Sequence, residues 1–175
     1  TPSGGGQGPP DDPIMDIFGS AGGVPDDDME WTVSDPDKYF KIKDLQSLQI
    51  PELPLSSTEK IGWDIQVSTR IGAIDRSESD LLTRWFLLAA TCTGDPLTVV
   101  NRFHTKTQGL HALDKYIGAQ LVAGKNLEHP IFGVKFAAYV RWCTRHRCAP
   151  RGRVMIAMIT LRFLSLIHIS EPTRQ

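Results

Sequence analysis

The sequence of 175 residues has few of the features that identify disulfide-bonded, membrane or secreted proteins. Its three cysteines, Cys92, Cys143 and Cys148, are an odd number without the paired spacing of a secreted scaffold, so we expect free thiols in a reducing compartment. The longest apolar run covers residues 154–169, includes Arg162, and is shorter than the roughly 20 residues that a bilayer requires. We therefore predict a cytoplasmic protein without a membrane-spanning segment.

Catalytic signatures are absent as well. His111 and Asp114 are three residues apart on a predicted helix, close enough for a hydrogen bond, and His104 precedes them. No nucleophile elbow, Gly-rich phosphate loop or carboxylate pair accompanies these residues, so we expect no enzymatic activity, cofactor or small-molecule substrate. Residues 143–148 contain two cysteines and His146, but zinc sites need four converging ligands. We expect a buried structural Cys143 and an exposed Cys148 there, and no metal.

Basic residues are missing from the first 30 positions, which hold seven of the 20 acidic residues. Glycine and proline are frequent in the same segment, and such a composition buries too little apolar surface to offset chain entropy. We predict a disordered acidic linker over residues 1–37. Residues 14–18 form a small apolar island within it, either a docking motif or an incidental cluster. The other 145 residues carry 13 acidic and 19 basic residues, a net charge of +6.

Apolar residues at helical spacing predict an all-α domain over residues 38–163, a bundle of about five or six short helices. The predicted helical segments are 58–75, a Leu-rich segment from about 81, 96–103, 113–121, 132–143 and 154–164. Ser56 and Glu59 form a capping box before the first, and residues 77–80 are a second start signal. Residues 38–54, which end in Pro51 and Pro54, are typical of an extended strap lying across helices.

A cluster of positive charge lies between residues 135 and 153, where six basic residues occur without one acidic residue. The six are Lys135, Arg141, Arg145, Arg147, Arg151 and Arg153. With Trp142 and His146 among them, they can neutralise phosphates and stack a base, which predicts salt-sensitive RNA binding with little sequence selectivity. The alternative is a solvated helix end, because basic side chains favour the negative end of the helix dipole without any nucleic acid.

The tryptophans are expected to pack in or against the hydrophobic core. The four are Trp31, Trp63, Trp85 and Trp142, and the last three fall within helical apolar patterns. We expect them to be core or partly buried anchors, and not a platform for stacking bases.

Both ends of the chain have unusual features. Residues 165–175 resemble a translated sequencing adapter of the kind found at the ends of unrelated transcriptome-derived proteins, so we predict a non-native tail over residues 164–175. The first residue is Thr, and no signal-peptide pattern follows it. We expect the sequence to be a piece of a longer chain.

Several of these features together resemble a known family. They are the "IPxLP" strap at residues 50–54, the helix with Trp63, the Leu-rich second helix, residues 113–116 (LDKY) with Ala119 and Leu121, and residues 151–153 (RGR) before an apolar helix. On these features, residues 45–160 resemble the Gag-like region at the start of copia-type retrotransposon polyproteins of the dinoflagellate type. The resemblance implies an all-helical capsid-like module that forms homo-oligomers around the RNA of the element.

The sequence departs from the fuller retrotransposon pattern because it lacks a zinc knuckle and any protease, integrase or reverse-transcriptase motif. Two hypotheses follow. In the first, the chain is a structural Gag-like module for self-assembly and RNA packaging. In the second, it is a helical protein-protein interaction module of a host protein, with residues 14–18 recruiting the partner.

Overall fold

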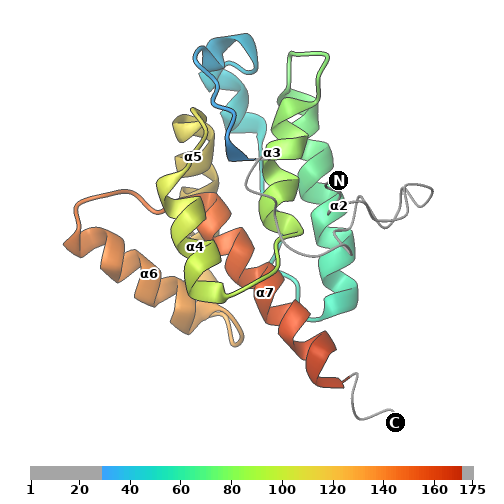
Figure 1. Ribbon diagram of the computed structural model, residues 1–175, viewed down its shortest axis with the longest axis vertical. Coiled ribbons are helices and arrows are strands. Elements are labelled where there is room, and N and C mark those ends of the chain that lie inside the picture. The colour runs from blue at the N-terminus through green and yellow to red at the C-terminus, as the bar shows by residue number, and fades with distance from the viewer. Residues whose placement is uncertain (1–28, 171–175) are drawn as a thin grey trace, which may run out of the picture.

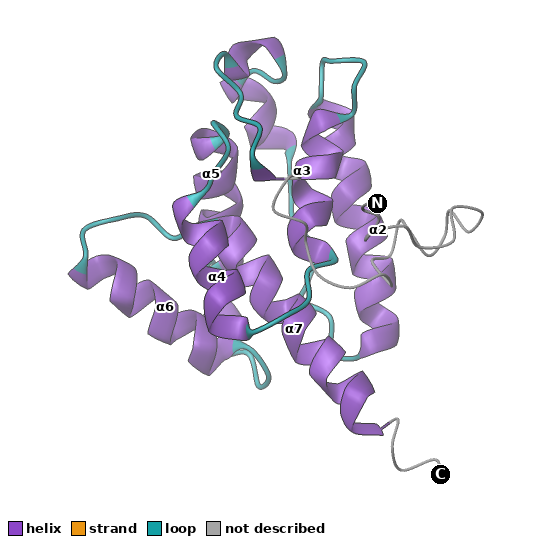
Figure 2. Cartoon of the chain, viewed as in Figure 1, coloured by secondary structure: helices purple, strands orange, loops and turns teal. Residues whose placement is uncertain are grey.

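The computed structural model describes residues 29–170, with side chains described as far as Ser165. This part of the chain contains α-helices and short 3-10 helices and no strand, which confirms the predicted all-α fold (Figures 1 and 2). The elements are η2 (Pro36–Lys38), η3 (Ile42–Ser47), α2 (Ser57–Ile74), α3 (Leu81–Ala90), α4 (Pro96–Thr105), α5 (His111–Leu121), η4 (Asn126–Glu128), α6 (Gly133–Arg145) and α7 (Gly152–Ser170).

Helix α7 forms the centre of the bundle. It packs against α4 and α5 near its start and then passes α3 and α2 (Figure 1). Its first turns are buried on every side, at Val154, Met155, Ile156 and Ala157. A helix surrounded by other helices needs no polar face, which explains its nearly continuous apolar sequence. No helix among the described residues has the length and hydropathy needed to cross a bilayer.

The start of α2 follows the predicted capping box in part. The backbone N–H of Glu59 donates to Ser56 Oγ over 3.1 Å, as expected. The Glu59 carboxylate accepts from the N–H of Leu55, one residue before the position that a capping box uses. The second start signal is also modified, because the cap of α3 comes from Asp75, whose Oδ2 accepts from Leu82 N over 3.0 Å.

The strap holds α2 and α5 together. The N–H of Ile50 donates to Gln120 Oε1, and Gln120 Nε2 donates to the carbonyl of Leu48, both over 2.9 Å. The indole N–H of Trp63 donates to the carbonyl of Pro51 over 3.3 Å. The strap is not extended throughout, because η3 forms one part of it. Polar contacts from two helices thus fix a segment that has little regular structure of its own.

The boundary predicted between linker and domain is wrong. We expected residues 1–37 to lie outside the domain, but Met29 and Val33 are buried in the core, and Val33 N donates to the carbonyl of Gln108 over 2.9 Å. The domain therefore includes residues 29–37 as well. The acidic residues before Met29 and the apolar island at residues 14–18 lie outside the described residues.

The predicted tail overlaps α7. The helix continues to Ser170, and Phe163 and Leu164 pack against the core cluster. Residues 171–175 lie outside the described part of the chain. The adapter origin of residues 164–175 stays a prediction.

Candidate nucleic-acid interface

Four of the six predicted RNA-binding residues are exposed on α6 or just after it. Lys135, Arg141 and Arg145 lie on the outward side of α6, and Arg147 follows the end of the helix. Helix α6 lies at the edge of the bundle beside α4 (Figure 1). Within residues 29–165 no ion pair joins any of these four to a carboxylate. Arg141, Arg145 and Arg147 lie together near the end of α6, whereas Lys135 lies in its first turn.

Arg153 does not belong to this surface, and its predicted role in RNA binding is wrong. Its side chain is 0% exposed. The guanidinium donates to the carbonyl of Trp85 over 3.2 Å, to Gln108 Oε1 over 2.8 Å and to the carbonyl of Lys106 over 2.6 Å. It also lies 4.4 Å from the Trp85 ring centroid and 4.9 Å from that of Phe103. Arg153 connects α3, α4 and the following loop to α7, so its role is structural.

Asp114 faces the same buried region. We expected its carboxylate within reach of His111, but Asp114 Oδ1 accepts from Arg153 N over 2.9 Å and so caps the start of α7. His111 pairs with Thr107. Burial raises the pKa of the Asp114 carboxyl, although the Arg153 charge opposes that shift. The LDKY and RGR segments, distant in the sequence, therefore meet at the start of α7.

Two glycines allow α5 and α7 to approach closely at that point. A Cβ on Gly118 would lie 2.4 Å from the carbonyl oxygen of Pro150, and one on Gly152 would lie 2.5 Å from the side chain of Ile117. Real Cβ atoms do not approach other atoms so closely, so both positions require glycine in this packing. The glycine of the RGR segment thus has a packing role.

The end of α6 is a tight turn that follows Arg145 and carries Arg147. Cys148 N donates to the carbonyl of Cys143 over 3.0 Å, and Arg147 N donates to that of Thr144 over 3.2 Å. These two bonds define a Schellman ending, which needs a left-handed residue before its last member. Arg147 fills that position with φ 57°. The chain reverses there and exposes the Arg147 side chain.

An exposed aromatic pair accompanies the arginines. Trp142 is 38% exposed and its ring stacks on His146, with centroids 4.1 Å apart and planes inclined by 20°. The Trp142 ring also meets the His104 ring edge-on, with centroids 5.0 Å apart, and lies nearly parallel to the Tyr139 ring at 6.5 Å. We expected Trp142 to be a core or partly buried anchor. It is only partly buried, because α6 lies at the edge of the bundle. In the sequence, the position of Trp142 between Arg141 and Arg145 was the feature that indicated an exposed ring among basic residues.

His104 and Arg151 support this surface from behind. The His104 Nδ1 atom lies 2.7 Å from Tyr139 Oη, which also accepts from Arg151 N over 3.0 Å. Partial burial, reinforced by the charges of Arg151 and His146, lowers the pKa of His104. Arg151 is half-buried, and its Nη1 donates to the carbonyl of Ala149 over 2.7 Å. Arg151 therefore shapes the loop and contributes charge at its edge.

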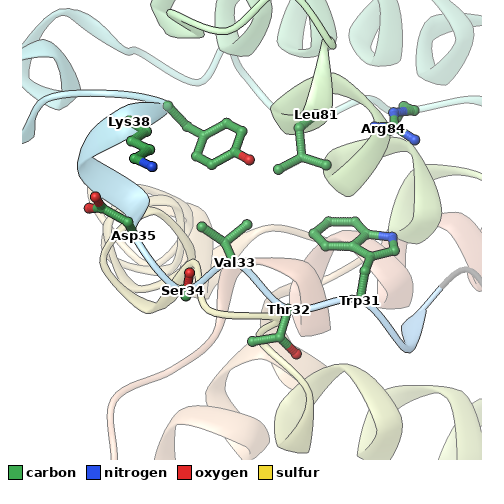
Figure 3. A pocket seen from close by; sticks show the side chains of 9 residues that line it. Trp31, Thr32, Val33, Ser34, Asp35, Lys38, Leu81 and Arg84 are labelled. Carbon is green, nitrogen blue, oxygen red and sulfur yellow. The ribbon is translucent and has the colours of Figure 1, made fainter.

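Other polar features lie elsewhere in the fold. Figure 3 shows an open pocket of about 420 Å³ between residues 31–39 and the start of α3, where Asp35, Lys38 and Arg84 surround apolar side chains. No predicted site residue lines it. Lys60 forms a buried ion pair with Asp64, and burial raises the pKa of the Asp64 carboxyl. Among the described residues no group of three or more His, Cys, Asp or Glu is arranged to hold a metal ion.

Comparison with protein-family models, with curated proteins and with solved structures finds no match to this chain.

Proposed function

We propose that the chain is a structural Gag-like module that binds RNA through the exposed end of α6 and self-associates. The binding surface, called here the basic α6 surface, consists of Arg141, Trp142, Arg145, His146 and Arg147. The observation that carries the proposal is the exposed Trp142 ring lying among arginines that have no carboxylate partner within residues 29–165. Such a combination of stacking face and free cations suits single-stranded RNA.

The residues of the basic α6 surface have different expected roles in RNA binding, which follow from their positions. Arg141 and Arg145 are one helical turn apart, so their guanidinium groups reach adjacent points along a nucleic-acid backbone. Arg147 extends the row beyond the helix end. The Trp142 ring already stacks on His146, so a nucleobase adds to an existing stack and binds without base-specific hydrogen bonds. The expected binding is therefore salt-dependent and weakly selective.

Self-association is supported by exposed aliphatic side chains on α2 and just before it. Leu55, Ile61 and Ile65, called here the apolar α2 surface, are 55%, 52% and 49% exposed. Ile61 and Ile65 are one turn apart on the outward side of the helix. Exposed aliphatic groups at helical spacing favour a helix-helix contact. The same surface favours the second candidate function, a module that binds a different host protein.

RNA binding is tested by titrating the full chain with fluorescent single-stranded RNA at several salt concentrations. Replacing Arg141, Arg145 and Arg147 together by Ala should reduce the slope of log K against log salt by about 2, because each phosphate contact contributes about 0.7 for single strands. Trp142→Ala should weaken binding by about 1–3 kcal/mol and leave the slope unchanged. Arg84→Ala, a change at an exposed arginine on α3, is the control.

Self-association is tested by sedimentation velocity of the full chain and of an Ile61→Lys/Ile65→Lys variant, with Leu97→Lys as the control. Leu97 is 79% exposed on α4, outside the apolar α2 surface. Concentration-dependent oligomers that the double substitution removes and the control retains would support the module. A monomer that binds no RNA would refute the proposal, and specific capture of one host protein by that monomer would favour the interaction module.

A further inference from the structure

Four side chains behind the basic α6 surface form a closed ring of contacts that RNA binding does not require. The His104 Nδ1 atom lies 2.7 Å from Tyr139 Oη, and His104 Nε2 lies 3.8 Å from Cys148 Sγ. The thiol of Cys143 interacts electrostatically with both Tyr139 and Cys148, which closes the ring. The two cysteines therefore lie near each other, although a turn of the chain separates them.

The backbone holds the two thiols together. In a Schellman ending, the residue that donates the last hydrogen bond frequently packs against the residue that accepts it. Here these residues are Cys148 and Cys143, joined by the 3.0 Å bond between their main chains. The left-handed Arg147 maintains this geometry. A disulfide forms without backbone movement only where two residues already lie this close.

The two thiols differ in surroundings. Cys143 is 1% exposed, and burial raises the pKa of its thiol to about 11. Cys148 is half-buried, and its sulfur interacts with the Cys143 thiol and lies 3.8 Å from His104 Nε2. When Tyr139 donates to His104 Nδ1, the imidazole proton resides on Nε2 and points at that sulfur. Hydrogen-bond donors, partial exposure and nearby arginines are the setting of reactive cysteines.

We infer that Cys143 and Cys148 form a peroxide-sensitive dithiol, with Cys148 the attacking thiol and Cys143 the resolving one. The Cys148 thiolate attacks a hydroperoxide, the O–O bond breaks, and a sulfenic acid and hydroxide (or alkoxide) result. The Cys143 sulfur then attacks the Cys148 sulfur, the S–O bond breaks, and water leaves with the Cys143 proton. The peroxide gains two electrons, and the two thiols lose two in forming one disulfide.

A disulfide between Cys143 and Cys148 would change the end of α6. It would close the loop that carries Arg145 and Arg147 and fix the end of α6. Cys92 is remote from this site, being 0% exposed near Lys60, and burial raises the pKa of its thiol to about 12. The same chain therefore contains a natural internal control thiol.

The test treats the reduced full chain with hydrogen peroxide, blocks the remaining thiols with iodoacetamide and maps tryptic peptides without reduction. Trypsin cleaves after Arg141, Arg145, Arg147 and Arg151, so the expected product is the peptide 142–145 linked to the peptide 148–151. Two of the three thiols should be lost and the intact mass should fall by two hydrogen atoms. Reducing agent should restore both thiols. Alkylated Cys92 should remain throughout.

Variants separate the two roles. Cys143→Ser should stop the reaction at the Cys148 sulfenic acid, which dimedone captures, whereas Cys92→Ser should behave as wild type. His104→Gln should slow the loss of Cys148 thiol. In guanidinium chloride all cysteines should react alike, which shows that the folded ring sets the preference.

Several results would overturn the inference. They are equal reactivity of Cys92 and Cys148 in the folded protein, disulfides only between chains, or thiols that survive peroxide unchanged. Because the thiols are measured directly in the absence of RNA, these results are independent of the proposed RNA binding.

Discussion

The strongest expectation concerns Arg153, whose burial converts a predicted RNA-binding residue into a structural one. Replacing Arg153 by Met keeps an unbranched side chain but removes the guanidinium. The carbonyl oxygens of Trp85 and Lys106 then each lose a buried charged donor, and the Asp114 carboxylate loses its nearest compensating charge. The contacts with the Trp85 and Phe103 rings are lost as well.

The expected cost follows from these losses. Leaving a buried acceptor unpaired costs about 1–3 kcal/mol, and breaking a buried charge network typically costs about 3–5 kcal/mol. We therefore expect Arg153→Met to lower the free energy of unfolding by about 4 kcal/mol, a large part of the stability of a typical domain. Arg153→Lys should also destabilise, because a lysine keeps the charge but not the planar group that bridges three acceptors and two rings.

Urea unfolding followed by tryptophan fluorescence measures this effect, since the ring of Trp85 contacts the guanidinium. With a slope of about 2 kcal/mol per molar for a small domain, the midpoint should fall by about 2 M. Arg145→Met is the matched control, because Arg145 is exposed and its loss should change stability by less than about 0.5 kcal/mol. An Arg153→Met protein as stable as wild type, but deficient in RNA binding, would refute the structural role.

Two further predictions concern packing and pH. Gly118→Ala should lower the free energy of unfolding by about 2 kcal/mol, because the added Cβ meets the carbonyl of Pro150. Gly62→Ala, which has open space around the added Cβ, should raise it by about 0.5–1 kcal/mol in the same urea assay. The pKa of His104 is lowered on folding, so its contribution to stability is complete above pH 6.5 and decreases as the pH falls below that value. Thermal unfolding between pH 7.5 and 5.5 should therefore show a smaller loss for His104→Gln than for wild type, and equal losses would contradict this assignment.

Local patterns predicted the elements of this fold well. The Ser56 cap, the apolar spacing of α2 and the uninterrupted apolar start of α7 are properties of neighbouring residues, and the structure shows each helix close to its predicted position. The all-α fold followed from these signals. The start of the domain was misplaced because Met29 and Val33 are isolated apolar residues, whose burial depends on contacts with residues near Gln108.

The membership of the candidate site depended on contacts between residues that are far apart in the sequence. Arg145 and Arg153 look alike as basic residues near a helix end, yet one is exposed and the other buried. Their difference comes from Trp85, Gln108 and Lys106, which lie about 45 to 70 positions away from Arg153. In the same way, His104 approaches Cys148 only because α4 and α6 are neighbours.

The sequence by itself determined the helices, the positive segment and the nearness of Cys143 to Cys148, because hydrogen bonds and side-chain periodicity within one helix act over a few residues. Tertiary structure alone decided which arginines are exposed to solvent, that Trp142 stays partly exposed and which histidine faces the Cys148 thiol. Burial and partner choice depend on how helices pack against one another, and that packing is a property of the whole chain.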